Sequence, residues 1–361
     1  MARLRVLLSA AFLVTASATS ALAEWQEQYG KAQDALKAKD YPGAEGAAIA
    51  ALNDADSSSF AADDERRIST MRLLARVYQE TRQWATASPI YEQILATYAS
   101  KGMDQSPEAG NLQNDLGIVY VKMRELIKAE TAFNASLQIK RKKYKQNVAS
   151  IALVLSNLGE LYRQQGKWKE AEELHKQAIS DKENELGPDH PSLVTSLNNL
   201  AIVYRETKRT EEAKPLLERA ITLGEKASAE NPDERSNYAT ALHNLADYYS
   251  NKRDFEHARP LYEKALKLRR EALGNDHPWV AETLNNYANM LVSMDKAGEA
   301  LPMFDEAITI RQNEFGATDQ RVTKVMANKA MALDRLGKKD EAQKVRDAIK
   351  AIEEKRKAPP Q

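Results

Sequence analysis

Apolar residues recur at helical spacing along the chain. One clear set stands at positions i, i+3, i+4 and i+7: Leu155, Leu158, Gly159 and Tyr162. A second set with the same spacing follows a break at Gly166: Ala171, Leu174, His175 and Ala178. Residues so spaced share one face of an α-helix, and a glycine between two such sets interrupts the helical pattern. The sequence therefore predicts two consecutive helices that pack together along their apolar faces.

This two-helix pattern repeats through the chain. A small residue of the first helix recurs at spacings of 43, 42, 42, 42, 45, 42 and 42: Ala32, Ala75, Gly117, Gly159, Ala201, Ala246, Ala288 and Ala330. A second series lies 12 residues after the first: Ala44, Ala87, Ala129, Ala171, Ala213, Ala258, Ala300 and Ala342. Small residues fit where two helices cross closely, because a larger side chain would push the backbones apart. Two series in fixed register predict eight helix pairs without a separate domain boundary.

The repeated unit resembles the tetratricopeptide repeat. Its pattern is L-x2-L-[GA]-x2-Y in the first helix and A-x3-[large]-x2-A in the second. The sixth unit contains every position of this pattern: Leu242, Leu245, Ala246, Tyr249, Ala258, Tyr262 and Ala265. The 42-residue period and the junctions LGPDHP at 186–191 and LGNDHP at 273–278 are similar to the longer repeats of kinesin light chains and their bacterial relatives.

The resemblance covers about residues 25–356 and carries implications for fold and function. It implies an all-α, right-handed superhelical solenoid of about eight helix-turn-helix repeats, with the first helix of each pair on the concave side. It also implies that the concave groove binds a peptide segment or a protein partner. A structural scaffold of the cell envelope that uses its convex face or its ends is the alternative function.

The first 23 residues have the pattern of a secretory signal peptide. Two arginines precede an apolar run over residues 6–14, and small residues end in Ala21-Leu22-Ala23. We expect cleavage after Ala23 and a periplasmic or secreted protein. A retained membrane anchor is the alternative, although it needs roughly 20 apolar residues. The repeat array is then expected at 24–356, with a disordered tail at 357–361 and longer loops at 53–64 and 227–232.

Composition and charge exclude several classes of function. The chain has 52 basic and 52 acidic residues, and removal of Arg3 and Arg5 leaves 50 against 52, a net charge of −2. This balance gives no global electrostatic reason to bind nucleic acid or an anionic membrane. The chain contains no cysteine. Disulfide frameworks, thiolate zinc sites and cysteine nucleophiles are therefore excluded.

Motifs of catalysis and cofactor binding are absent from the sequence. It has no G-x-x-x-x-G-K-[ST] loop, no H-E-x-x-H and no G-x-S-x-G, so we expect neither an enzyme nor a bound cofactor or metal. His190 and His277 lie in the repeated Asp-His-Pro junctions. We interpret them as helix starts, with Pro191 or Pro278 at the first helical position. His175 is expected to be a packed core residue.

Asparagines occupy one equivalent position of the first helices, two residues before the small residue: Asn157, Asn199, Asn244, Asn286 and Asn328, with Asp115 in the third unit. At about 100° per residue, this ladder position points roughly 150° away from the apolar stripe and toward the groove. Other candidate groove residues share its side: Asp247, Asn289, Thr195, Ile202, Glu206, Thr240, Asn251, Glu282 and Ser293. Arg205 is a further candidate groove residue.

The asparagine ladder has two interpretations. A carboxamide offers both a donor and an acceptor, so it can hold an extended peptide backbone whatever the side chains of that peptide are. Asparagines of this kind can instead bond to neighbouring repeats and set the curvature of the array. The sequence favours neither interpretation, since asparagine is also the family consensus at this position.

A basic run ends the second helix of the third unit: Lys140, Arg141, Lys142, Lys143 and Lys145. Cations favour a helix C-terminus, where they interact with the helix dipole. A solvated helix end is therefore the simpler interpretation of the run. A docking patch for an anionic partner is the alternative.

Overall fold

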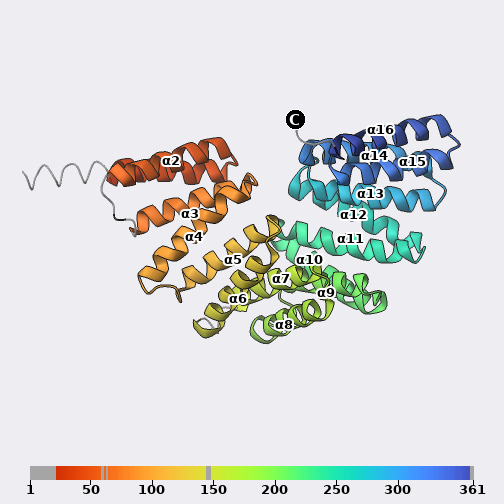
Figure 1. The fold of residues 1–361 in the computed structure, drawn as a ribbon. Helices are drawn as coiled ribbons and strands as arrows, with labels where there is room; N and C mark the ends of the chain where they lie inside the picture. The colour runs from red at the N-terminus through yellow and green to blue at the C-terminus, as the bar shows by residue number, and fades with distance from the viewer. Residues whose placement is uncertain (1–21, 58–60, 62–63, 144–147, 358–361) are drawn as a thin grey trace, which may run out of the picture. The chain divides into compact units, whose positions relative to one another are not determined.

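The computed structural model describes residues 22–57, 61, 64–143 and 148–357. Within these ranges the regular structure is entirely helical, and no strand occurs. The chain divides into two compact bodies, the N-terminal body over residues 1–174 and the C-terminal body over residues 175–361. Helices follow one another along each body with short connections (Figure 1).

The N-terminal body begins with a helical segment at 22–37. Its further helices are α2 (Tyr41–Ser57), α3 (Glu65–Glu80), α4 (Trp84–Ser100), α5 (Pro107–Lys122), α6 (Leu126–Lys143), α7 (Val148–Gln164) and the first part of α8 (Trp168–Leu186). The C-terminal body continues with α9 (Leu193–Glu206), α10 (Thr210–Glu230), the 3₁₀ helix η1 (Pro232–Glu234), α11 (Arg235–Asn251), α12 (Phe255–Leu273), α13 (Pro278–Ser293), α14 (Ala297–Phe315), α15 (Gln320–Arg335) and α16 (Lys339–Lys357).

These helices confirm the predicted all-α array of helix pairs. Every residue of the two small-residue series is buried, from Ala32 to Ala342. The close approach that requires them is clearest at Gly117 of α5. A Cβ atom there would lie 2.6 Å from the ring of Phe133, which α6 contributes. Because that ring is itself buried, no larger residue fits at this crossing without moving the paired helix.

We expect Gly117→Ala to lower the free energy of unfolding by about 1–3 kcal/mol, since the added methyl overpacks the crossing of α5 and α6. Gly46 of α2 supplies the matched control, because a Cβ atom there meets nothing within 4 Å. Gly46→Ala should stabilise the protein by roughly 0.5–1 kcal/mol through better helix propensity. Urea unfolding of both variants measures the two effects. Equal effects of the two substitutions would refute the close crossing.

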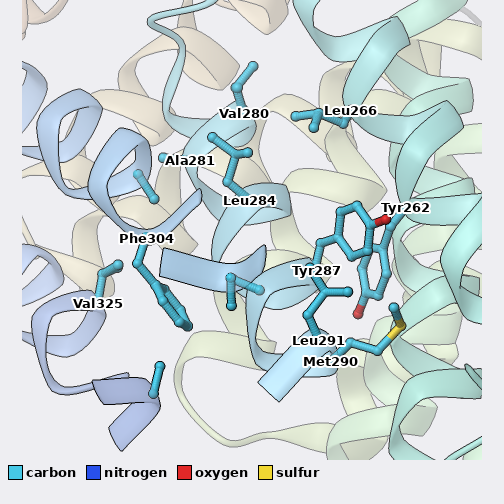
Figure 2. Close-up of a cluster of buried hydrophobic side chains, with 14 of the residues drawn as sticks. Tyr262, Leu266, Val280, Ala281, Leu284, Tyr287, Met290, Leu291, Phe304 and Val325 are labelled. Atoms are coloured by element: carbon cyan, nitrogen blue, oxygen red, sulfur yellow. The ribbon is translucent and has the colours of Figure 1, made fainter. Parts of the chain in front are cut away.

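The core of the C-terminal body is continuous from one helix pair to the next. One apolar cluster runs from Ala246 of α11 to Ala332 of α15 (Figure 2). Within it the rings of Tyr262 and Tyr287 stack with centroids 5.6 Å apart, and Phe304 is fully buried. Each pair thus buries its apolar face against its neighbours, which is how a repeat array gains stability.

Several predicted boundaries are wrong. Helix α2 continues through residues 53–57, because neither glycine nor proline interrupts it there. Helix α10 continues to Glu230, so the expected loop begins only at Asn231, whose side chain caps η1 by accepting from the amide of Asp233. The three extra residues at this junction therefore lengthen α10 to 21 residues. Helix α16 includes Lys357, the first residue of the expected tail.

The two proline junctions differ at their helix starts. Pro278 is the first residue of α13, as predicted, and His277 caps the helix by accepting from the amide of Trp279. The prediction is wrong for Pro191, since α9 begins at Leu193. The amide of Leu193 bonds to the carbonyl of His190, three residues earlier, so this segment forms a tight turn before the α-helix begins. The expected core residue His175 is buried, which confirms that prediction.

Both ends of the chain lie outside the described residues. The predicted signal peptide falls on residues 1–23, of which 1–21 are not described, and residues 358–361 of the expected tail are not described either. In the described part of the chain, every helix is either too short or too polar to span a bilayer.

Candidate functional site

Asparagines of the ladder bond from one first helix to the next. In the N-terminal body, Asn157 Nδ2 donates to Asn114 Oδ1 at 2.9 Å, joining α7 to α5. In the C-terminal body, Asn328 Nδ2 donates to Asn285 Oδ1 at 2.8 Å, joining α15 to α13. Both bonds span 43 residues and end on the residue just before the ladder position of the preceding repeat. We call this bond the amide rung.

A third amide rung lies in a charged network on α11 and α13. Asn286 Nδ2 is 3.4 Å from His243 Nε2 and donates to both carboxylate oxygens of Asp247, at 3.1 and 3.3 Å. The same carboxylate accepts from Tyr262 Oη at 2.6 Å and from Arg205 Nη1 at 3.2 Å. Asp247 therefore ties together four helices, α9, α11, α12 and α13.

Burial keeps this network uncharged at its histidine. Only 3% of His243 is exposed, and burial lowers the pKa of its ring, while the carboxylate of Asp247 opposes that shift. The pKa of Tyr262 is raised, chiefly by burial and also by the charge of Asp247. The tyrosine thus stays protonated and remains a donor to the carboxylate. These states suit a structural junction, because Tyr262, Asn286 and Arg205 all donate to Asp247, although His243 Nδ1 is buried without a hydrogen-bond partner.

The rung between α9 and α11 is open. Asn244 should donate to Asn198 by the pattern of the other rungs, but the two residues are 46 positions apart because of the three-residue insertion. Asn244 Nδ2 and Asn198 Oδ1 are both buried and have no hydrogen-bond partner. Asn244 Oδ1 accepts only a long bond, 3.5 Å, from Arg205 Nη1. This junction therefore holds an unused donor and an unused acceptor.

The eight predicted site residues thus fall into three groups. The structure brings four of them together on α9, α11 and α13: Arg205, Asn244, Asp247 and Asn286. Asn157 and Asn328 form separate rungs. Asn199 and Asn289 are half-buried, and among the described residues their side chains make no hydrogen bond. The contacts of the ladder favour the inter-repeat interpretation for the closed rungs and leave the open rung available to a ligand.

A cavity adjoins the open rung. It lies between α9, α10 and α11 and has a volume of about 210 Å³. Its lining combines apolar and polar residues: Ala201, Ile202, Arg205, Thr210, Ala213, Leu217, Asn244, Tyr248, Asn251 and Lys252. Three of these, Ile202, Asn244 and Asn251, are positions that the helical periodicity predicted to face the groove. The cavity therefore borders the face formed by the first helices, which we call the first-helix face, and also reaches the α9–α10 crossing at Ala201 and Ala213.

A second cavity lies on the first-helix face of the N-terminal body. It has a volume of about 550 Å³ and polar walls: Tyr29, Gln33, Ser69, Arg72, Leu73, Arg76, Gln79, Glu80, Tyr91 and Asp115. The sequence analysis missed Arg72 and Arg76, because Leu73 occupies the ladder position of this repeat. The two arginines stand one turn apart on α3, and this i, i+4 spacing beside the ladder position was the available signal.

Asp115, the ladder residue of the third repeat, is part of the lining of this second cavity. Burial raises the pKa of its carboxyl group above the ordinary 3.8, while the amide of Asn114 and the charge of Arg72 act in the opposite direction. The carboxyl group therefore binds its proton more tightly in the folded than in the unfolded chain, so ionisation of Asp115 costs stability at neutral pH. Asparagine, which stands here in later repeats, carries no such cost.

We expect Asp115→Asn to raise the free energy of unfolding by roughly 0.5–2 kcal/mol at pH 7. Because the folded-state pKa of Asp115 is raised, the wild type regains this difference as the pH falls through that pKa toward the ordinary value. Urea unfolding of both proteins at pH 7 and pH 4 tests the sign. A larger advantage of the variant at the lower pH would contradict the assignment.

The basic run contains a buried cation. Only 3% of Lys140 is exposed, and its ammonium group donates to Asn111 Oδ1 at 2.8 Å and to Ser150 Oγ. Arg141 and Lys142 are exposed, as a solvated helix end predicts. The side chain of Lys143 and the whole of Lys145 lie outside the described residues. Lys140 thus links α6 to Asn111 of α5 and Ser150 of α7 inside the protein, so it is not part of an exposed docking patch.

Equivalent second-helix positions of the C-terminal body also carry cations, of which Lys182 and Arg269 are buried and Arg311 is half-buried. Lys182 donates to the carbonyl of Ser192, Arg269 to that of Trp279 and Arg311 to that of Arg321. In every case the acceptor lies near the start of the next first helix. The exception is α10, where Gly224 stands at this position and Tyr238 packs against it. The junction with the open rung therefore lacks the buried cation as well.

The family follows from comparison with known proteins. A tetratricopeptide repeat model matches residues 66–142, 150–226, 237–313 and 280–345. This chain belongs to the tetratricopeptide repeat family. No curated protein matches the chain. Tetratricopeptide repeats are protein-interaction scaffolds that present extended binding surfaces.

Solved structures of similar fold include other tetratricopeptide arrays. The nearly identical TPR-like repeats of a Podosopora anserina kinesin light chain are 22% identical, with a TM-score of 0.49, over 60% of this chain and 100% of theirs. BtubC (BKLC) from P. vanneervenii is 25% identical, with a TM-score of 0.56, over 65% of this chain and 94% of its own. The apo quorum sensor NprR from B. thuringiensis is 13% identical, with a TM-score of 0.67, over 90% of this chain and 86% of its own.

The junction histidines of this tetratricopeptide array have local roles. His190 Nδ1 lies 2.9 Å from Ser192 Oγ and accepts from the amide of Ser192, while His277 caps α13. Across the described ranges, no three His, Cys, Asp or Glu side chains gather closely enough to hold a metal ion. The groups available on the first-helix face are amides, arginines and carboxylates, together with one polar cavity and one cavity of mixed lining.

Proposed function

We propose that this chain is an exported module that binds a peptide segment or a protein partner on its first-helix face. The observation that carries this proposal is the position of the cavities. In the N-terminal body, a polar cavity is lined mainly by first-helix residues. Separately, in the C-terminal body, a cavity between α9, α10 and α11 includes the first-helix residues Ile202, Asn244 and Asn251 in its lining. Concave sites with a few polar groups are the usual places where proteins bind ligands.

The family supports a binding function over a catalytic one. Tetratricopeptide arrays act as scaffolds for protein interaction, and the structurally similar NprR is a quorum sensor, which responds to a signal. The polar groups of the first-helix face also suit main-chain recognition, since amides and guanidinium groups supply donors for peptide carbonyls. A peptide or protein partner uses these features without any catalytic residue.

A comparative pull-down tests the binding surface. The full chain is used as bait on extracts of the cells that express it, and captured proteins are identified by mass spectrometry. Two variants accompany it: Arg72→Gln with Arg76→Gln on the first-helix face, and Glu256→Gln with Lys267→Gln on the exposed side of α12. We expect the first variant to lose partners that the second retains. Loss from the α12 variant alone would support the scaffold function on the second-helix side.

Export is tested separately by sequencing the N-terminus of the protein from fractionated cells. The proposal predicts a chain that begins at Glu24, recovered outside the cytoplasm. The observed basis is the charged, apolar and small-residue order of residues 1–23. A cytoplasmic chain that still begins at Met1 would contradict export, while the binding proposal would stand.

A further inference from the structure

The junction between the fifth and sixth repeats departs from the rest of the array in three ways. Helix α10 has 21 residues, whereas the second helices α12, α14 and α16 each have 19. Gly224 replaces the buried cation found at equivalent positions. The amide rung of Asn244 and Asn198 is open. Of the three, the open rung adjoins the cavity, because Asn244 is part of its lining. Gly224 and the lengthened end of α10 lie toward the start of α11.

An open rung destabilises the fold unless another group pairs with its unused donor and acceptor. Only 6% of Asn244 and 3% of Asn198 are exposed, so water reaches their unpaired atoms poorly. A buried donor without an acceptor costs stability, which is why such groups are rare in folded proteins. Asn244 also lines the cavity between α9, α10 and α11. A ligand seated in that cavity can supply the missing acceptor, and a peptide carbonyl is an acceptor of the right kind.

The size and walls of the cavity select one apolar side chain. Its volume of about 210 Å³ is below the roughly 300–1,000 Å³ of sites that enclose a whole drug-sized molecule. The buried walls include Ala201, Ala213 and Leu217, which offer only apolar surface. Burial of one large side chain in such a pocket typically dominates the affinity of a protein interface.

The charges at the edge of the cavity are already balanced. Arg205 donates to Asp247 at 3.2 Å, and Lys252 pairs with Glu211, which also accepts from Tyr248 Oη at 2.9 Å. A charged ligand side chain would therefore have to displace an existing ion pair. An uncharged ligand side chain can enter without displacing an ion pair. The main chain of the same ligand residue then lies within reach of the Asn244 amide.

We propose that the open rung and the adjoining cavity form one subsite for an extended peptide segment. The cavity holds an uncharged side chain of the size of leucine, methionine or phenylalanine. Asn244 Nδ2 donates to a main-chain carbonyl of the same segment. This inference rests on the proposed function, and it adds the chemical class of the residue that anchors the partner.

The test begins with peptides selected on the full chain from a random linear library displayed on phage. Selected peptides are synthesised, and their affinities are measured by fluorescence anisotropy. Replacing the anchor residue of the peptide by alanine should weaken binding about ten-fold or more. Thr210→Trp places an indole at the edge of the cavity and should weaken binding similarly. In that variant the alanine replacement in the peptide should have little further effect, because both changes remove the same contact.

The amide contact is tested by Asn244→Asp. This change keeps the shape and the acceptor for Arg205 but removes the amide donor, so affinity should fall by about ten-fold. The added carboxyl is buried near Asp247, so the variant should also melt at a lower temperature than the wild type while remaining folded. Thr309→Trp on exposed α14 and Asn275→Asp in the loop between α12 and α13 are the matched controls, and both should bind as the wild type does. Melting temperatures of all variants separate loss of binding from loss of fold.

Three results would overturn the inference. Peptides that bind with equal affinity to the wild type, Thr210→Trp and Asn244→Asp would leave the proposed function intact but exclude this subsite. Selection of no binding peptide at all would contradict peptide recognition itself, and the subsite with it. The third result is that octanoate binds the wild type but not Thr210→Trp, while no peptide distinguishes the two proteins. The cavity would then be a site for a free acyl chain.

Discussion

Arg269→Ala is expected to lower the free energy of unfolding by about 3–5 kcal/mol, because the change leaves a cavity and removes buried hydrogen bonds. Arg269 is 2% exposed. Its guanidinium donates to the carbonyl of Trp279 and to Thr283 Oγ1, both at 2.7 Å, and lies 3.4 Å from Glu282. Without it the start of α13 loses these hydrogen bonds to α12. The Thr283 hydroxyl loses its donor, whereas the Trp279 carbonyl still accepts from Thr283 Oγ1 at 3.0 Å.

Urea unfolding measures the total effect, and hydrogen exchange should localise the loss to α12 and α13. Lys267→Ala is the matched control, since this lysine of the same helix is 77% exposed and makes only a 4.0 Å pair with Glu271. That control should stay within about 0.5 kcal/mol of the wild type. A change below about 1 kcal/mol for Arg269→Ala would show that the buried cation contributes little to the junction.

Asp247→Ala should lower the free energy of unfolding by about 2–4 kcal/mol, because several donors lose one shared acceptor. The hydroxyl of Tyr262 is the most affected, since this residue is only 1% exposed. Arg205 and Asn286 lie nearer to solvent and can be hydrated in part. Asp247→Asn retains one acceptor oxygen and should lose less than the alanine variant.

Asp305→Ala is the control for this second substitution. Its carboxylate is 56% exposed and pairs with Lys329 on the surface, where ion pairs contribute little. Thermal unfolding monitored by circular dichroism compares the three variants. If Asp247→Ala melts like the control, the charged network of α11 and α13 is not an inter-repeat support, and its residues become available for partner binding.

The fold could be predicted from sequence in most respects. The small-residue series required close helix crossings, and the contact of Gly117 with Phe133 shows the physical reason. The boundaries were less accurate because loop-like composition does not end a helix by itself. Residues 227–230 continue α10, since the inserted residues lengthen that helix before Pro232 begins η1.

For the candidate site, the sequence predicted which way the side chains point but not which residues they contact. A helical wheel placed Asn157 and Asn286 on the first-helix face, but it contains no distance to the neighbouring first helix. That distance decides whether an amide reaches Asn114 or faces solvent. The rung partners stand 43 residues earlier, one position before the ladder, so a search for paired polar residues at that spacing could have found them. The same search would have found the open rung, where the spacing is 46.

Site-specific photocrosslinking tests the central claim most directly, that the partner lies on the first-helix face. A benzophenone amino acid is placed at Thr195 of α9 or Asn251 of α11, both exposed on that face, and at Lys267 on the exposed side of α12. The full chain is then irradiated in the cells that express it. The account predicts a crosslinked partner protein from Thr195 or Asn251 and none from Lys267. Crosslinks from Lys267 alone would contradict it and place the working surface on the second helices.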